Sequence, residues 1–148
     1  MIGHSVAETE PRINTVSMLG EAYSLLGFRI VHGVVGAGIP IKPRYSAVFA
    51  QLGPHGARVT DLARGANMTP QAMGELVDEL EAQDYVIRAP DPSDRRAKLV
   101  TMTHLGKQAV DAAGVTISGI EADLDDVLGP DGHDQLRKLL EQILGQRT

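Results

Sequence analysis

The chain has 148 residues, the usual size of a single domain, so we expect one fold across residues 1–148. It contains no cysteine, which excludes disulfides, thiolate metal ligands and a cysteine nucleophile, and its 43% hydrophobic residues without tryptophan predict an aliphatic core. The net charge of −5 argues against a polyanionic partner, but residues 88–98 hold four basic and two acidic residues, a local basic spot compatible with focused contact to DNA.

The N-terminal segment has neither the basic start nor the apolar run of a signal peptide. The longest uncharged stretch that follows, residues 30–41, is too short to span a bilayer. We therefore expect a cytoplasmic protein without a membrane partner. Residues 13–37 are predicted to form a long helix that is poor in charge and ends before Pro40.

A short helix is expected to open at Pro43, because proline suits the first helical position, and to end at the turn of residues 53–56. The next helix is expected to take Thr60 as its N-cap, because a threonine hydroxyl accepts from free backbone N–H groups of the first turn. Residues 65–68 then break this helix.

Residues 69–83 predict a further helix, with Thr69 as N-cap and Pro70 at the first helical position. The spacing of its apolar residues predicts one buried face formed by Met73, Leu76, Val77 and Leu80. Two short helices joined by a tight turn are the helix-turn-helix pattern, so this second helix is the candidate recognition helix.

Two short strands are predicted at residues 85–88 and 98–101. The segment between them, residues 89–97, is polar and contains two prolines. It is too long for a tight hairpin and is expected to form a protruding loop, the wing.

Two helices are predicted after the wing, over residues 103–128 and then to about residue 146, separated by Gly129 and Pro130. Both carry apolar stripes, formed by Ile117, Ile120, Leu124 and Val127 and by Leu136, Leu139, Leu140, Ile143 and Leu144. A compact winged helix has no place to bury them, so residues 13–38 and 103–146 are expected to join two subunits. The predicted fold class is α/β, mostly α: a winged helix-turn-helix over residues 42–102, with a two-stranded wing, in a homodimer.

From about residue 44 to residue 106 the chain resembles the MarR family (multiple antibiotic resistance regulators). The most specific element is the wing signature, Asp-x-Arg and, after five spacer residues, Leu-Thr. It stands here at residues 94–96 and 102–103, with Met102 in place of leucine. The resemblance implies a dimer joined by its terminal helices, wings that reach a minor groove, and small, often aromatic or phenolic, ligands bound between the dimer and DNA-binding regions.

The recognition helix departs from the family pattern. Where the family often has Ser or Thr followed by Arg, this chain has Gly74 and Glu75, and Asp84 replaces the usual turn glycine. Residues 70–83 carry no base and four acids. We expect Asp78, Glu79 and Glu81 to form a solvated acidic face.

The candidate DNA contacts of the recognition helix lie in its N-terminal half: Thr69, Gln71, Ala72, Gly74 and Glu75. Thr69 and the free N–H groups beside it suit a phosphate. Gln71 can bond adenine bidentately, and Glu75 can accept from cytosine N4. The alternative is an ordinary solvated helix face.

In the wing, the motif assigns Arg96 to a narrow, electronegative minor groove, with Asp94 holding its guanidinium, while Arg95 and Lys98 would contact phosphates. The alternative is a surface loop with an ion pair worth only ~0–1 kcal/mol.

The candidate effector pocket comprises Phe28, His32 and Tyr45. For His32 a histidine satisfied at an interface is an equal alternative, and for Tyr45, as for Tyr23, core packing is favoured. The histidines lack ligand spacing and no catalytic arrangement is present, so we expect no metal, no cofactor and no enzyme activity.

The function predicted is a sequence-specific transcriptional regulator, a repressor, that binds a pseudo-palindromic double-stranded DNA operator as a homodimer and responds to a small-molecule effector. The alternative is a winged-helix module that uses its acidic helix against a protein partner. The acidic helix favours the alternative, and the wing motif favours DNA.

Overall fold

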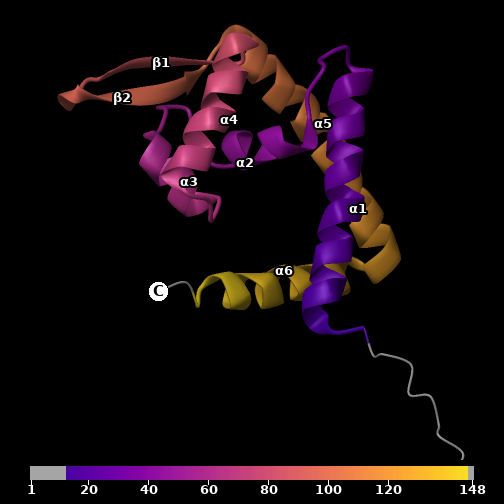
Figure 1. The fold of residues 1–148 in the computed structure, drawn as a ribbon. Coiled ribbons are helices and arrows are strands. Elements are labelled where there is room, and N and C mark those ends of the chain that lie inside the picture. Colours follow the sequence, from indigo (N-terminus) through magenta and orange to yellow (C-terminus); the bar gives the residue numbers. More distant parts are fainter. Residues whose placement is uncertain (1–12, 147–148) are drawn as a thin grey trace, which may run out of the picture.

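The computed structural model describes residues 13–146 and confirms the predicted fold class, mostly helical with one two-stranded antiparallel sheet. Its elements, labelled in Figure 1, are α1 (Thr15–Gly36), η1 (Pro43–Tyr45), α2 (Ser46–Phe49), α3 (Val59–Gly65), α4 (Pro70–Ala82), β1 (Val86–Asp91), β2 (Asp94–Met102), α5 (His104–Leu128) and α6 (Pro130–Leu144). In the described part of the chain, no helix is long and apolar enough to cross a membrane.

Helices α1 and α5 run side by side and connect two separate parts of the molecule (Figure 1). The short helices α2, α3 and α4 and the β1–β2 arm gather at one end, while α6 extends from the other end of α5. The two long helices cross closely at Gly33, where an added Cβ would overlap the Thr116 hydroxyl. An ion pair of 2.5 Å between Arg29 and Asp123 also joins them.

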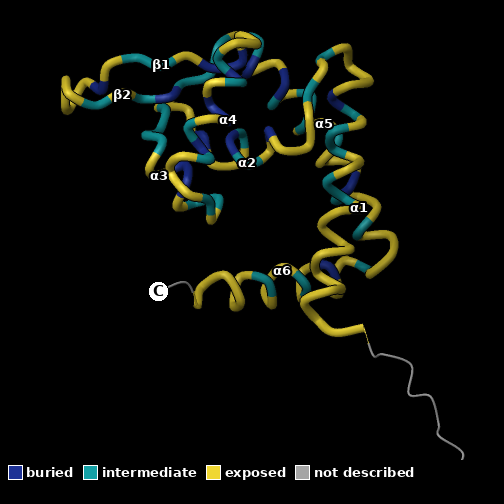
Figure 2. The backbone as a smooth tube through the Cα atoms, viewed as in Figure 1, coloured by how far each residue is buried: buried dark blue, intermediate teal, exposed yellow. Residues whose placement is uncertain are grey.

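The hydrophobic core lies almost entirely in the first of these parts, between η1 and β2 (dark blue in Figure 2). The recognition-helix face predicted from the sequence is confirmed, because all four of its apolar residues are buried. From the long helices, Val34 of α1 and Ala109 of α5 reach this core. Most of α1 and α6 is exposed (yellow in Figure 2).

The predicted caps are confirmed for two helices and wrong for one. The Thr69 and Thr103 hydroxyls each accept from the backbone N–H three residues on, at 3.1 Å. Helix α3, however, begins at Val59 with Arg58 as N-cap, and Thr60 lies inside its first turn. The reason is a backbone bridge between Ala57 and Val100, which holds the chain extended up to Arg58.

The wing is a closed hairpin and not the open loop expected for residues 89–97. The two strands pair from Val86 with Met102 to Pro90 with Lys98, then through an irregularity to Asp91 with Asp94, so a two-residue turn connects them. The Asp91 carboxylate stabilises this turn by accepting from the Ser93 N–H at 2.9 Å and from its hydroxyl at 2.8 Å.

Helix α4 is fastened to the segment between α1 and α2 by one carboxylate, that of Glu79. Its Oε1 accepts from Lys42 Nζ at 2.8 Å and from the Tyr45 hydroxyl at 2.9 Å, and Arg44 Nη2 lies 2.5 Å from both oxygens. Gln83, one turn further on, donates to the same tyrosine oxygen at 2.7 Å. The hydrogen bonds from Lys42 and then Arg44 lower the pKa of Glu79 to about 2.

The expectation of a solvated acidic face on α4 is therefore wrong for Glu79, whereas the Asp78 side chain is 70% exposed, as expected for a solvated acid. The Glu79 side chain is only 25% exposed, while Asp78 and Glu81 both pair with Arg88 of β1, at 2.8 and 3.2 Å. The cations that cover these acids come from elements before and after the helix, which the periodicity of the helix itself does not reveal.

We expect Gly106→Ala to destabilise the protein, because a Cβ there would overlap the carbonyl oxygen of Tyr85 and lie 3.3 Å from Met102 Cβ. Overpacking of this kind costs about 1–3 kcal/mol. Gly114→Ala on the same helix is the matched control, since no atom lies within 4 Å of its Cβ, and we expect it to be neutral or slightly stabilising. Denaturant unfolding at one protein concentration measures both, and equal stability of the two variants would contradict this packing.

We expect Glu79→Gln to weaken the acid dependence of stability. The folded state lowers the pKa of this carboxyl from 4.5 to about 2. Its ionised form therefore stabilises the fold above the unfolded pKa, and this contribution is lost as the pH falls from about 4.5 to about 2. The measurement is the free energy of unfolding across that window. Glu75→Gln, one turn earlier at an exposed position, is the control, and identical pH profiles for both variants would contradict the role of Glu79.

Candidate nucleic-acid interface

Of the predicted recognition-helix residues, Thr69 caps α4, and Gln71, Ala72, Gly74 and Glu75 lie in its N-terminal half, where Ala72 and Glu75 also line a hollow described below. Thr69, Gln71 and Glu75 are exposed, and Ala72 and Gly74 are half-buried. No atom lies within 4 Å of a Cβ built at Gly74, so another molecule can approach the backbone closely there. Glu75 forms no ion pair with any described residue, unlike the three acids that follow it.

The wing presents three exposed cations, Arg95, Arg96 and Lys98, and none forms an ion pair within residues 13–146. The role expected for Asp94 is not what the structure shows. Its Oδ1 accepts from the backbone N–H of Arg96 at 3.0 Å, and no ion pair with the Arg96 guanidinium forms. Asp94 thus shapes the backbone at Arg96 and leaves the guanidinium available to an external partner.

Arg88 belongs by sequence to the basic spot of the wing, but it does not add to its exposed charge. Its side chain is 21% exposed and pairs with Asp78 and Glu81 of α4. Its backbone N–H also donates to Glu81, at 2.9 Å. Arg88 therefore ties the base of the wing to the recognition helix.

A second contact of this kind, between Arg58 and Asp91, was not predicted from the sequence. Asp91 is 6% exposed, and its Oδ2 accepts from Nε and Nη2 of Arg58 at 3.0 and 2.7 Å. The backbone hydrogen bond from Ser93, followed by the side-chain bonds of Arg58 and Ser93, lowers the pKa of Asp91 to about 2. The two partners are 33 residues apart, so no local spacing could have indicated the pair.

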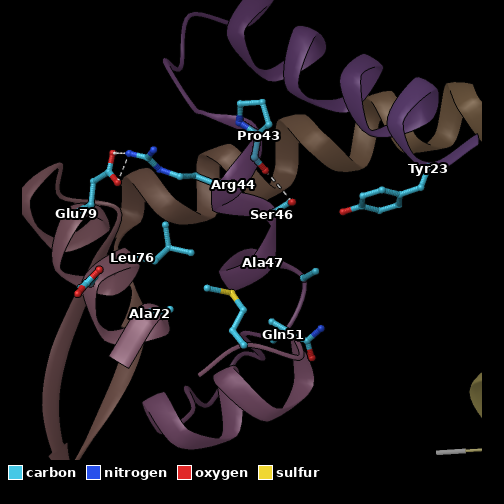
Figure 3. Close-up of a pocket in the computed structure, with 13 residues that line it drawn as sticks. Tyr23, Pro43, Arg44, Ser46, Ala47, Gln51, Ala72, Leu76 and Glu79 are labelled. Atoms are coloured by element: carbon cyan, nitrogen blue, oxygen red, sulfur yellow. Dashed lines mark hydrogen bonds and ion pairs between the residues drawn. The ribbon is translucent and has the colours of Figure 1, made fainter. Parts of the chain in front are cut away.

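A hollow of about 810 Å³ lies between Tyr23 of α1, the segment of η1 and α2, the loop that follows α3, and α4. Its lining is apolar over Ala47, Ala72 and Leu76, and the Arg44–Glu79 pair stands at one end (Figure 3). Tyr23 of α1 lies at the opposite end. Core packing was the favoured expectation for Tyr23 and is wrong, because this residue is 70% exposed.

The three predicted effector residues do not come together. Phe28 and His32 contact each other on α1, with ring centroids 5.7 Å apart, and both are exposed. Phe28 lines a second, shallower hollow along α1. Tyr45 is fully buried and packs on Tyr85 at 5.9 Å, as the core alternative predicted. Within residues 13–146, no group of three or more His, Asp or Glu side chains is arranged to hold a metal ion.

Known proteins share parts of this sequence and most of this fold. The sequence model of the MarR family matches residues 39–97. An uncharacterized HTH-type transcriptional regulator of Bacillus subtilis (strain 168), YxaD, is 39% identical over 62 residues. This alignment spans 42% of the present chain and 42% of the relative, so it covers less than half of either protein.

Solved structures match over nearly the whole chain. The transcriptional repressor CouR bound to a 23-mer DNA duplex is 25% identical, with a TM-score of 0.71 over 88% of this chain and 92% of its own. CouR from Rhodococcus jostii RHA1 bound to p-coumaroyl-CoA is 24% identical, with a TM-score of 0.70 over 90% of this chain and 92% of its own. The S. aureus MepR–DNA complex is 17% identical, with a TM-score of 0.73 over 94% of this chain and 100% of its own. The last two show the fold alone. The matched segment and the shared architecture together show that residues 39–97 are similar to MarR-family regulators, and that the described part of the chain has the winged-helix fold of a transcriptional repressor whose structure was solved on DNA.

Proposed function

We propose that the protein is a cytoplasmic repressor that binds a pseudo-palindromic double-stranded DNA operator as a homodimer and is released by a small-molecule effector. The observation that carries the proposal is a group of exposed cations on the wing, which have no ion-pair partner among residues 13–146: Arg95, Arg96 and Lys98. An arginine enters a narrow minor groove favourably because the potential there is strongly negative. Repressor function and binding to a DNA duplex are stated for CouR, which shares this fold.

The N-terminal half of α4 would read bases in the major groove. Gln71 is placed to bond adenine, Glu75 to accept from cytosine N4, and Ala72 to contact a thymine methyl. Thr69 would lie near a phosphate at the helix N-terminus, with Gly74 facing the groove wall. These roles follow from residue type and from position in the N-terminal half of α4, where Gln71 and Glu75 are exposed.

The acidic residues of α4 oppose DNA binding less than their number in the sequence suggests. Of its four acids, Asp78 and Glu81 are paired with Arg88, and Glu79 with Lys42 and Arg44. Repulsion of phosphates depends on the charge that remains after such pairing. Glu75 is the one acid of α4 without an ion-pair partner among the described residues, which favours DNA over a protein partner.

The homodimer is proposed from the exposed apolar residues of the terminal helices, residues 13–38 and 103–146. On α6, Leu139, Ile143 and Leu144 are about half exposed, and the helix packs on α5. A second copy would cover these residues and bring two α4 helices to half-sites about 34 Å apart. The remaining segment, residues 42–102, would be the DNA-binding region.

The effector would be a small aromatic or phenolic molecule in the hollow beside α4. The apolar surface of Ala47, Ala72 and Leu76 fits a flat ring, and Tyr23 and Arg44 offer polar groups at its two ends. Binding of p-coumaroyl-CoA is stated for CouR. Because α4 forms one wall, an occupant would alter the position of the recognition helix. Phe28 and His32 remain a second candidate site on α1.

We expect Arg96→Ala to weaken operator binding by about 1–3 kcal/mol, or about 5- to 150-fold, through the loss of one groove contact. The operator is first selected with the wild-type protein from a pool of random duplexes, and affinities are compared at one fixed salt concentration. Arg64→Ala is the matched control, since it removes the same charge from an exposed position paired with Asp61.

Wild-type affinity in Arg96→Ala would contradict the wing assignment. A salt titration of the wild-type protein on random duplex tests the alternative function. DNA binding weakens steeply as salt rises, whereas a module that binds only proteins has no duplex affinity to titrate.

We expect the wild-type protein to sediment as a dimer at micromolar concentration and Ile143→Glu to sediment as a monomer, because a charge would then be buried at the proposed interface. Glu141→Lys on the same helix changes an exposed charged residue and is expected to leave the dimer intact. A stable, folded wild-type monomer would contradict the interface.

A further inference from the structure

We infer that Arg58 is the residue that positions the outer half of the wing relative to the helix-turn-helix, so that the approach of Arg95 and Arg96 to DNA depends on a side chain outside the wing. The inference rests on the proposed function for its DNA readout, but the contact itself is a property of the chain.

The hairpin is held to the rest of the molecule at successive points along its length. At its base, Ala57 and Val100 exchange two backbone hydrogen bonds of 2.8 and 3.1 Å. On the α4 side, Arg88 pairs with Asp78 and Glu81. Beyond these points, the side-chain hydrogen bonds that join residues 90–97 to any described element outside the hairpin all come from Arg58.

The Arg58 contact has the geometry of a rigid support. Its planar guanidinium donates through two nitrogens, Nε and Nη2, to one oxygen of Asp91, at 3.0 and 2.7 Å. The other oxygen of Asp91 accepts both bonds from Ser93. The carboxylate is thus saturated on both sides, and its burial makes the loss of either partner costly.

A second contact extends this support toward the residue proposed to enter the groove. Nη2 of Arg58 also lies 4.0 Å from Asp94 Oδ2, and the opposite oxygen of Asp94 accepts from the backbone N–H of Arg96. Arg58 is itself the N-cap residue of α3, directly before the helix. Its side chain therefore relates the position of α3 to the backbone that carries Arg96.

The test compares Arg58→Met with Arg64→Met, which removes the same charge from the exposed end of the same helix. Arg58→Met is expected to speed amide hydrogen exchange in residues 89–98 and to lower operator affinity by about 10-fold or more, while the dimer persists. Arg64→Met is expected to change neither readout. Arg58→Lys keeps the charge but not the two-nitrogen contact, so we expect it to recover only part of the affinity.

Two outcomes would overturn the inference. In the first, Arg58→Met keeps wild-type exchange in the wing, so Arg58 does not hold it. In the second, Arg58→Met speeds amide hydrogen exchange in the wing and Arg96→Ala weakens operator binding, yet Arg58→Met binds the operator like wild type. Holding the wing would then not serve DNA binding. The double variant Arg58→Met/Arg96→Ala is expected to bind the operator little worse than Arg96→Ala, because Arg58 acts by positioning Arg96 and that side chain is already absent.

The two proposals fail in different ways. If Arg96→Ala itself binds the operator like wild type, the proposed function of the wing is wrong. The claim that Arg58 supports DNA binding through the wing is then wrong as well. Hydrogen exchange in Arg58→Met and Arg58→Lys still decides whether Arg58 holds the arm, since that readout needs no DNA.

Discussion

The placement of the recognition helix depends on the carboxylate of Glu79. One side chain accepts from Lys42, Arg44 and Tyr45, all from the short segment that leaves α1 and enters α2. Without it, the Tyr45 hydroxyl, deep in the core, would lose its acceptor, and two cations would lose their counter-charge. The same group forms one end of the hollow beside α4. The contact that seats α4 on the rest of the chain is therefore also the contact that an occupant of the hollow would meet.

Local features of the fold were predictable because they are encoded within a few neighbouring residues. The apolar face of α4 repeats every three or four positions, and the Thr69 and Thr103 caps act on N–H groups three residues away. The turn after α4 illustrates a substitution that local chemistry tolerates. Asp84 takes the left-handed conformation, with φ 61°, where the family has glycine, and aspartate is among the few residues that adopt it at modest cost.

The contacts that periodicity could not predict join distant elements. Nothing near Asp91 indicates that its partner is Arg58, and nothing near Glu79 indicates Lys42. Both errors about charge have this origin: Glu79 was expected to be solvated, and Arg88 was counted with the exposed bases of the wing. The wing itself was located by its motif, but its strands are longer than predicted, because β1 continues through Pro90 and the hydrogen bonds between Asp91 and Ser93 close a tight turn that contains Pro92.

The two ties on the wing have a consequence for how this molecule can respond to its surroundings. Arg88 joins β1 to α4, and Arg58 joins the turn to α3, so the hairpin and both helices of the helix-turn-helix are linked as one body. A displacement of α4 would rotate the hairpin with it, and the contacts of Arg88 and Arg58 would be kept. In a two-fold assembly, such a movement alters the distance between two helix-turn-helix and wing units without distorting either of them. Discrimination would then reside in the spacing between half-sites as much as in the bases within each.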